Sequence, residues 1–444
     1  MNIKIDLNKK LGKIKAMNGV GQPPIGGGIG YNLCSKFHYL SDVSVPYSRL
    51  HDVGGMFGGN RFVDVPNIFR DFDADENDPK NYDFKFTDLV VSSLVKAGVE
   101  PYYRLGVTIE NSSEVESFRI SPPKDYEKWA RICEHIIAHY NEGWADGFEY
   151  NITYWEIWNE PDDGSYDGSK CSFMWTGSAE DYFRLYDVTA KHLKKRFPNI
   201  KIGGYAAIGF CALEGELEPL CDEPERFYHL DFFYDFLAYI KEHSSPIDFF
   251  SWHSYREPWR VVEEAFWYRK ALDKLGFEKV ESHLNEWNPV SINRGTGTVA
   301  PGTAEHAAQV AAIMLGSQNA PVDVLCVYDA RYTIGGYSVF FTSNVYPIRP
   351  THAYYSFAAF AALYNIGEQV ALECDTDRVY AVAASNNGKS AIMIANVSGK
   401  KQTLNIEGID LTGAKWHVLD DRRLLSWSPA VDTIDDSSVI LIEF

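Results

Sequence analysis

The chain lacks the features of a membrane-spanning or nucleic-acid-binding protein. It has no run of about 18 apolar residues, the length that a membrane-spanning helix needs. Basic residues are in deficit, because 42 Lys and Arg stand against 61 Asp and Glu and give a formal net charge of −19. Nucleic acids and anionic membranes attract basic surfaces, so we expect neither as a partner. A neutral ligand is easier for such a chain to accommodate.

Cysteine is also used sparingly and without a pattern. The seven cysteines are odd in number and scattered, with no Cys-x-x-Cys pair and no His/Cys cluster. This excludes a disulfide framework and a zinc site of that kind, and it indicates a reducing compartment. Residues Met1–Leu7 alternate polar and apolar like a strand and lack the profile of a signal peptide. We therefore expect a cytoplasmic protein, unless an export signal has been removed; the oligomeric state is not indicated.

Between residues 16 and 365, short apolar runs alternate with longer amphipathic ones, which is typical of βα units. The expected strands are Met17–Gly21, Val45–His51, Glu100–Leu105, Ile152–Asn159, Lys201–Tyr205, Asp248–Tyr255, Val280–Glu286 and Val322–Tyr328. The expected helices are Asp83–Lys96, Pro123–Tyr140, Ala179–Arg196, Leu230–His243, Val261–Leu275 and Thr303–Gln318. Eight strands interleaved with helices predict an α/β fold, a (β/α)8 TIM barrel. The alternative is an open doubly wound sheet, but no Gly-x-Gly-x-x-Gly joins a strand to a helix, and glycines 26–28 and 30 read as a turn cluster.

The last part of the chain, residues 366–444, has a different pattern. Short alternating runs are separated by turns such as Asn386-Asn387-Gly388, and no helical period is present. We predict an accessory C-terminal β-sandwich, joined by a strand from residues 1–15. Its expected role is to support the barrel.

Two segments share an apolar stretch, an asparagine, a glutamate and a nearby proline: Trp155-Glu156-Ile157-Trp158-Asn159-Glu160-Pro161 and His283-Leu284-Asn285-Glu286-Trp287-Asn288-Pro289. A proline disfavours helical geometry in the residue before it, so Glu160 is expected to be extended at a strand end. Active sites of barrels collect at the carboxyl ends of the strands. Two glutamates at such ends, amid tryptophans, indicate the paired carboxylates of a sugar-cleaving enzyme.

Other predicted strands also end in polar residues. Arg49, His51 and Asp52 end one strand, His253 and Tyr255 another, and Tyr328 and Asp329 a third. Alternation along a strand places Arg49 with His51, and His253 with Tyr255, on one face. By the same alternation Glu156 points into the barrel, where we expect a structural carboxylate paired with Arg104.

These motifs resemble the retaining glycoside hydrolases built on (β/α)8 barrels. The segment 155–161, Arg49-Leu50-His51 and Trp252-His253-Ser254-Tyr255 look most like glycoside hydrolase family 39, which contains β-xylosidases and α-L-iduronidases and whose barrel carries a β-sandwich. Two departures bear on the sugar. Asp52 follows His51 where many relatives have a small residue, and Tyr328-Asp329 stands where the wider clan often has tryptophan.

The resemblance implies that Glu160 is the general acid/base and Glu286 the nucleophile of a retaining double displacement. It implies an exo-acting enzyme on a β-linked pentoside such as a xyloside, without a cofactor. Arg49 would keep Glu286 ionised, Tyr255 would donate to it, and Asn159 would bind the sugar 2-hydroxyl. The remaining expected substrate contacts are His51, His253, Asp52, Tyr328 and Asp329 for hydroxyls, and Trp287, with Trp158 or Trp175, for an apolar wall.

Several alternatives remain open at this level. Within the same chemistry they are an arabinosidase, an endo-acting enzyme on a polysaccharide, and an α-L-iduronidase-like enzyme. The last needs a cation for the uronate, for which Arg104, Arg256, Arg260 and Arg331 are available. A non-catalytic carbohydrate-binding barrel is an alternative of another class. A metal-dependent hydrolase, with His51, Asp52 and His253 as ligands, is a further one.

Overall fold

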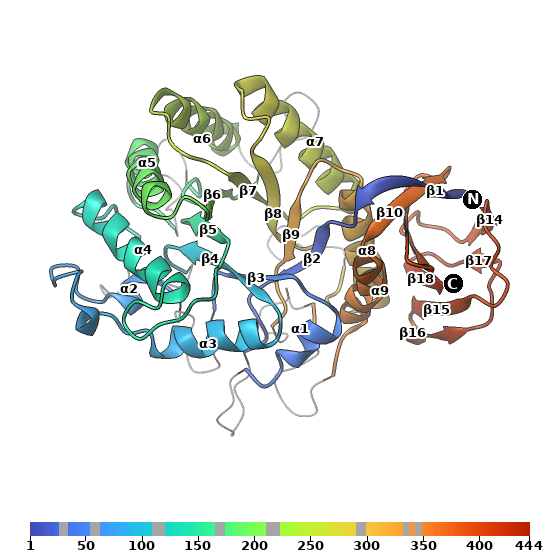
Figure 1. The fold of residues 1–444 in the computed structure, drawn as a ribbon. Coiled ribbons are helices and arrows are strands. Elements are labelled where there is room, and N and C mark those ends of the chain that lie inside the picture. Colours follow the sequence, from blue (N-terminus) through green and yellow to red (C-terminus); the bar gives the residue numbers. More distant parts are fainter. Residues whose placement is uncertain are drawn as a thin grey trace.

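The computed structural model describes residues 1–25, 34–53, 63–108, 120–164, 174–209, 223–289, 299–331, 337, 339–341 and 349–444. A closed parallel barrel and a separate, largely antiparallel sheet make up this part of the chain (Figure 1). The glycines at 26–28 and 30 lie outside the described residues. No helix in the described ranges has the length and apolar character needed to cross a bilayer.

Eight strands close the barrel in chain order. They are β2 (Ala16–Gly21), β3 (Tyr47–Leu50), β4 (Glu100–Leu105), β5 (Tyr154–Ile157), β6 (Lys201–Ala207), β7 (Phe249–Ser254), β8 (Glu281–Trp287) and β9 (Val324–Val327). All neighbours are parallel, and β2 pairs with β9 to complete the circle. The predicted TIM barrel is therefore confirmed, and the open doubly wound sheet is wrong.

Helices surround the barrel and cover its outer face (Figure 1). They are α1 (His38–Asp42), α2 (Val65–Ile68), α3 (Lys85–Lys96), α4 (Tyr126–Asn141), α5 (Ala179–Arg196), α6 (Glu223–Glu242), α7 (Pro258–Leu275), α8 (Ala304–Gln318) and α9 (His352–Ile366), with a 3-10 turn, η1 (Pro79–Asn81). Helix α5 begins at a capping box in which Ser178 and Asp181 exchange hydrogen bonds, and its predicted bounds are those observed. All six predicted helices are present.

Helix α9 was not among the predicted helices. It lies between the barrel and the second sheet, and most of its residues are buried. A helix that packs on both sides has no polar face, so the period of 3.6 residues that reveals a surface helix is absent. Its segment reads as an almost continuous apolar run.

The second sheet has the strand order β14-β1-β10-β11-β12-β18-β15-β16, with β13 and β17 paired separately. Its strands are β1 (Asn2–Lys13), β10 (Glu368–Cys374), β11 (Val379–Asn386), β12 (Lys389–Asn396), β14 (Asn405–Glu407), β15 (Lys415–Asp420), β16 (Arg423–Ser428) and β18 (Ser438–Glu443), beside β13 (Gln402–Thr403) and β17 (Thr433–Ile434). The N-terminal strand β1 pairs with β10 and β14, which brings both chain ends into this sheet (Figure 1).

Strand β12 shows how this sheet joins the barrel. Ala391, Met393 and Ala395 belong to the main hydrophobic core, whereas Ile392 and Ile394 belong to a second core inside the accessory part. Successive side chains of a strand point to opposite faces, so β12 is buried on both. One face packs toward the barrel helices α8 and α9, which fixes the sheet on the side of the barrel.

Candidate active site

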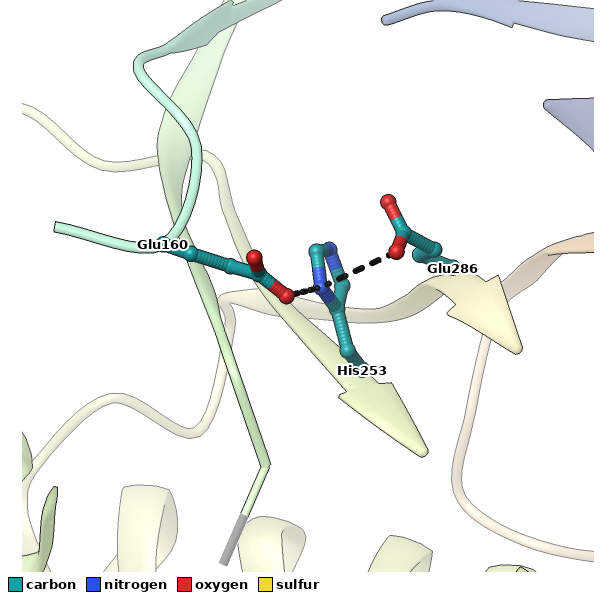
Figure 2. A group of neighbouring side chains, drawn as sticks. All are labelled: Glu160, His253 and Glu286. Carbon is teal, nitrogen blue, oxygen red and sulfur yellow. Dashed lines mark hydrogen bonds and ion pairs between the residues drawn. The ribbon is translucent and has the colours of Figure 1, made fainter. Parts of the chain in front are cut away.

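Glu160 and Glu286 lie side by side at the carboxyl ends of the barrel strands. Glu160 follows β5, and Glu286 is the penultimate residue of β8. One carboxyl oxygen of each lies within 4.8 Å of the other. The imidazole of His253, on β7, stands between them, with Nδ1 2.7 Å from Glu160 Oε1 and 3.8 Å from Glu286 Oε1 (Figure 2). Three strands thus bring two carboxyl groups and one imidazole together.

The backbone at Glu160 is not extended, and that prediction is wrong. Its φ is 45°, and Trp158 two residues earlier has a φ of 74°. The amide of Trp158 donates to Leu105 O (2.8 Å), at the end of β4, and the amide of Glu160 donates to Ala206 O (3.0 Å), in β6. These bonds to neighbouring strands outweigh the local preference set by Pro161. Left-handed backbone at such residues costs about 1–3 kcal/mol and is common at functional sites.

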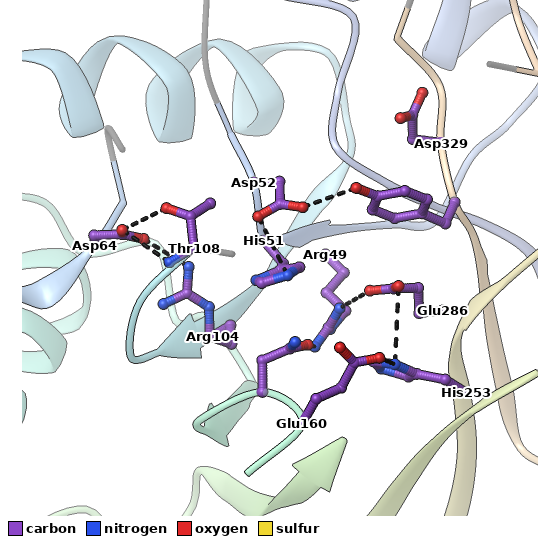
Figure 3. Close-up of polar contacts among 12 residues, drawn as sticks. Arg49, His51, Asp52, Asp64, Arg104, Thr108, Glu160, His253, Glu286 and Asp329 are labelled. Carbon is purple, nitrogen blue, oxygen red and sulfur yellow. Dashed lines mark hydrogen bonds and ion pairs between the residues drawn. The ribbon is translucent and has the colours of Figure 1, made fainter. Parts of the chain in front are cut away.

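Arg49 is a buried cation beside the carboxylate of Glu286 (Figure 3). Its Nη1 lies 3.0 Å from Glu286 Oε2, its Nε donates to Glu156 Oε2 (2.8 Å), and its Nη2 donates to Asn159 Oδ1 (2.6 Å). Burial acts to lower the pKa of Arg49, but the charges of Glu156 and Glu286 raise it overall. This arginine therefore carries a permanent positive charge between two carboxylates.

Glu156 and Arg104 do not form the ion pair expected from the sequence. They are register neighbours on β5 and β4, yet Arg104 Nη2 lies 2.7 Å from Asp64 Oδ1 (Figure 3). Glu156 is instead held by Arg49 and by the side chains of Ser251 (2.6 Å) and Asn285 (2.5 Å). Glu156 is a fully buried structural carboxylate, as predicted, with a different partner. Asp64, the N-cap of α2, was not predicted from the sequence as a partner of Arg104.

The two central glutamates differ in electrostatic environment. Burial raises the pKa of Glu160 well above its ordinary range, and the nearby charges of Asp163 and Asp162 raise it further. Burial and the charge of Glu160 also raise the pKa of Glu286, but the charge of Arg49 and the hydrogen bond from Tyr255 act against that rise. Tyr255 donates to Glu286 Oε1 at 2.6 Å. Glu160 is thus the carboxyl group with more reason to be protonated, and Glu286 the one with partners for its charge.

Asp162 and Asp163 were not singled out from the sequence. Both are buried directly beyond Glu160-Pro161. The signal that was available is the acidic pair itself, immediately after the Asn-Glu-Pro motif. Charged residues so close to an acid in a buried turn influence its pKa whichever way the turn folds.

His253 is neutral at neutral pH, because burial lowers its pKa to about 4. Its Nδ1 forms a hydrogen bond with Glu160 Oε1, and its Nε2 has no hydrogen-bond partner among the described residues. The same is true of Nδ2 of Asn159. Buried polar atoms are nearly always paired in a folded protein. These two atoms are therefore available to a bound ligand.

His51 and Asp52 follow β3 and lie in the same buried polar region as Arg49 (Figure 3). His51 Nε2 lies 3.3 Å from Asp52 Oδ1, and the Tyr328 hydroxyl donates to Asp52 Oδ2 at 2.8 Å. Asp329 lies 3.1 Å from the guanidinium of Arg331. Burial lowers the pKa of His51 well below its ordinary value and raises that of Asp329. Asp52, at the end of β3, and Tyr328 and Asp329, at the end of β9, thus form one acidic side of this region, which we call the acidic wall.

The tryptophans are less accessible than an apolar sugar platform requires. Trp287 follows Glu286 in β8, is completely buried and belongs to the main core. Trp158 donates from Nε1 to Met174 O (2.8 Å) and packs edge-on against Trp175. A contact between Trp287 and substrate stays a prediction.

The strongest candidate for metal ligation in the described ranges is Glu160, His253 and Glu286, whose ligand atoms all lie within 4.8 Å of one another. His51 and Asp52, expected in the metal alternative, are not part of this set. The donor set, two carboxylates and a neutral imidazole, is one that zinc accepts. The same three groups also contact one another directly, because His253 Nδ1 lies 2.7 Å from Glu160 Oε1 and 3.8 Å from Glu286 Oε1, an arrangement that needs no ion.

The sequence from residue 52 to 345 matches the family model of the Glycosyl hydrolases family 39. The chain belongs to this family. It is 27% identical over 242 residues to a β-xylosidase of Geobacillus stearothermophilus, covering 52% of this chain and 42% of that protein. It is 27% identical over 185 residues to a β-xylosidase of Caldicellulosiruptor saccharolyticus, covering 39% of this chain and 31% of that protein. The aligned part spans less than half the length of these relatives.

Solved structures resemble the whole family 39 chain, including the accessory sheet. A glucosidase from Croceicoccus marinus superposes with a TM-score of 0.77 at 20% identity, covering 100% of this chain and 98% of that one. A monomeric β-xylosidase from Caulobacter crescentus CB15 gives 0.68 at 15% identity, covering 100% and 99%. An α-L-arabinofuranosidase from Thermotoga maritima gives 0.63 at 14%, covering 100% and 99%. At these identities the likeness establishes the shared architecture.

Proposed function

We propose that this protein is a retaining glycoside hydrolase that cleaves a β-linked pentoside, such as a xyloside, by double displacement. One observation carries the proposal: the carboxyl oxygens of Glu160 and Glu286 approach within 4.8 Å. Retaining glycosidases hold their carboxyl groups about 5–5.5 Å apart, and inverting ones about 6.5–9.5 Å, to leave room for a water. The spacing here fits direct attack by one carboxylate.

In the first step, Glu160 gives its proton to the glycosidic oxygen while Glu286 attacks the anomeric carbon. The burial and the acidic neighbours that raise the pKa of Glu160 keep this proton in place near neutral pH. Arg49 and Tyr255 hold the carboxylate of Glu286 in its charged form and fix its orientation. Each group thus has neighbours that favour the protonation state its role requires.

In the second step, Glu160 takes a proton from water, which attacks the glycosyl-enzyme. Formation of the ester removes the negative charge of Glu286, which lies beside Glu160 and interacts with it. Loss of a neighbouring negative charge lowers the pKa of a carboxylic acid, so Glu160 becomes a better carboxylate once the ester exists. The same pair therefore supplies the acid in the first step and the base in the second.

The buried atoms without partners supply sugar contacts in this proposal. Asn159 Nδ2 donates to the 2-hydroxyl, an interaction that strengthens at the transition state of retaining enzymes. His253 Nε2 and His51 Nδ1 bind further hydroxyls. Asp52, Tyr328 and Asp329 form the acidic wall that accepts hydrogen bonds from the sugar.

A neutral sugar is favoured over a uronate. An α-L-iduronidase-like role needs a cation that is available to a carboxylate, but the four arginines considered already face acidic groups. The pairs are Arg104 with Asp64 (2.7 Å), Arg256 with Glu264 (3.9 Å), Arg260 with Glu263 (2.8 Å) and Arg331 with Asp329 (3.1 Å). The β-xylosidase relatives support a pentoside as the substrate. The loops expected to decide between exo and endo action include residues 165–173 and 210–222, which lie outside the described residues.

A panel of nitrophenyl glycosides, followed by proton NMR of the first-formed product, tests the proposal. We expect hydrolysis of the β-xyloside and release of β-xylose, which then mutarotates. Release of the α-anomer first would contradict retention. Binding of xylo-oligosaccharides without turnover of any glycoside would favour the carbohydrate-binding barrel.

A chelator separates the proposal from the metal-dependent alternative. We expect the same rate before and after dialysis against EDTA, because the acid–base pair needs no ion. A loss of activity that Zn²⁺ restores would assign Glu160, His253 and Glu286 to a metal instead.

A further inference from the structure

Asn288 lies two residues beyond Glu286, is completely buried, and connects the ends of three barrel strands. Its backbone amide donates to Ser254 O at the end of β7 (3.3 Å). Its side-chain Nδ2 donates to Tyr328 O, directly after β9 (2.6 Å), and to Tyr337 O (2.7 Å). Its Oδ1 lies 3.1 Å from His306 Nε2 in α8. A single residue therefore holds β8 to both of its neighbours, and its side chain makes the contacts to the end of β9 and to α8.

His306 fixes the orientation of this amide. The backbone amide of Gly302 donates to His306 Nδ1 (2.9 Å), so the ring proton is on Nε2, and Nε2 donates to Asn288 Oδ1. Burial lowers the pKa of His306 to about 3, so the ring stays neutral. With Oδ1 occupied in this way, Nδ2 must face the two carbonyl groups. These hydrogen bonds fix the orientation of both side chains.

The segments that Asn288 joins carry the groups around the proposed nucleophile. Ser254 stands between His253 and Tyr255, and the Tyr255 hydroxyl donates to Glu286. The rings of Tyr255, Tyr328 and Tyr337 pack against one another, with centroids 5.3 Å (Tyr255–Tyr337), 5.5 Å (Tyr328–Tyr337) and 6.3 Å (Tyr255–Tyr328) apart. Asn288 holds the backbone of two of these three tyrosines. A shift at Asn288 would reach Glu286 through this ring cluster.

We propose that Asn288, oriented by His306, is a positioning residue that holds the tyrosine cluster of Tyr255, Tyr328 and Tyr337 against the nucleophile Glu286. The inference rests on the proposed retaining mechanism and adds to it a residue that touches neither the sugar nor the reacting oxygen. Its effect falls on the step in which Glu286 attacks. Loss of about 1 Å of alignment in such a step costs as much as about a hundredfold in rate.

The test measures the attack step by itself, using inactivation by a 2-deoxy-2-fluoro-β-xyloside with a dinitrophenyl leaving group. This reagent accumulates the glycosyl-enzyme, so the rate constant at saturation reports attack by Glu286, and the half-saturation concentration reports binding. For Asn288→Ala we expect the rate constant to fall roughly tenfold or more, with little change in half-saturation. A folded Asn288→Ala that is inactivated within twofold of the natural protein would overturn the proposal.

Asn396 offers a matched control in the accessory sheet. It is also completely buried, and its Nδ2 donates to the carbonyls of Lys400 (2.9 Å), Ile434 (3.3 Å) and Asp435 (3.0 Å). Asn396→Ala should lower the melting temperature and leave the inactivation rate constant unchanged. Equal losses of rate in both variants, measured well below their melting temperatures, would assign Asn288 a purely structural role and refute the proposal.

If Asn288→Ala does not fold, two substitutions at His306 test whether the orientation of Asn288 affects attack by Glu286. His306→Gln keeps an N–H donor for Asn288 Oδ1, and His306→Leu removes it. We expect the glutamine variant to recover most of the rate that the leucine variant loses, and equal rates would contradict the role of His306. Failure of the proposed function gives a different result. In that case the natural protein itself is neither labelled at Glu286 nor able to hydrolyse any glycoside of the panel.

Discussion

The Tyr255 hydroxyl donates a 2.6 Å hydrogen bond to Glu286 Oε1 across the neighbouring ends of β7 and β8. Glu286 thereby has Tyr255 on one carboxyl oxygen and Arg49 on the other, at 3.0 Å. Both partners favour the carboxylate over the carboxylic acid. Glu160 has acidic neighbours instead, and this difference divides the proposed roles.

Removing the hydroxyl of Tyr255 should therefore weaken the nucleophile. Without this donor the pKa of Glu286 rises, so the acidic limb of the kcat/KM profile should move to higher pH in Tyr255→Phe. A hydrogen bond to a charged group contributes about 1.5–3 kcal/mol, so kcat/KM should fall roughly tenfold to a hundredfold. Tyr186→Phe is the control, because it removes a buried hydroxyl that donates to Pro246 O (3.0 Å), away from the site. An unmoved acidic limb in Tyr255→Phe would contradict the role of this bond.

Loss of the proposed acid should depend on the leaving group. Glu160→Ala should lower kcat/KM for xylobiose by about 10²–10⁴-fold, the usual contribution of general acid catalysis, and by far less for a dinitrophenyl xyloside, which departs without a proton. Azide should accelerate the second step of this variant and yield a β-azide. Parallel losses for the two substrates would count against Glu160 as the acid.

The acidic neighbours of Glu160 should set the alkaline limit of activity. Glu160 must be protonated for the first step, so activity is lost as the pH rises through its pKa. The charge of Asp163 raises that pKa, and Asp163→Asn should therefore shift the alkaline limb of kcat/KM to lower pH. Asp83→Asn makes the same change of net charge at an exposed pair with Arg70 and should leave the profile in place. A shift to higher pH in Asp163→Asn would show that Asp163 acts by another route.

Arg49 should be as important for stability as for catalysis. Arg49→Met leaves Glu156 buried without its cation, and removing one partner of a buried ion pair costs about 3–5 kcal/mol. We expect the free energy of unfolding, measured by urea denaturation, to fall by about that amount. Arg70→Met removes an exposed ion pair and should change it little. Similar unfolding midpoints for the two variants would refute the account of Arg49 as a buried anchor.

Much of the fold followed from local patterns. The eight barrel strands were predicted as short apolar runs and six of the helices as longer amphipathic ones between them, and the bounds of α5 were read from its cap and the proline behind it. Helix α9 was missed because it is buried on both sides and has no such period. An amphipathic period reveals burial on one face, and the apolar segment of α9 has no such period.

The local backbone at the site was harder to derive. Pro161 predicted an extended Glu160, but hydrogen bonds from Trp158 and Glu160 to β4 and β6 impose left-handed geometry. Register placed Arg104 beside Glu156, but Arg104 turns to Asp64, and Arg49 takes its place. In each case the partners lie on elements distant in the sequence, and no single segment contains the information that selects them.

The amino-acid sequence by itself determined which residues form strands and helices, and which polar residues end the strands. Those properties depend on neighbours a few positions apart. Only the tertiary structure decided that Glu160, His253 and Glu286 face one another, that Arg49 serves two carboxylates, and that Asp162 and Asp163 surround the acid. Distances and pKa values arise from groups far apart in the chain, because closure of the barrel and exclusion of water create the environment in which these charges interact.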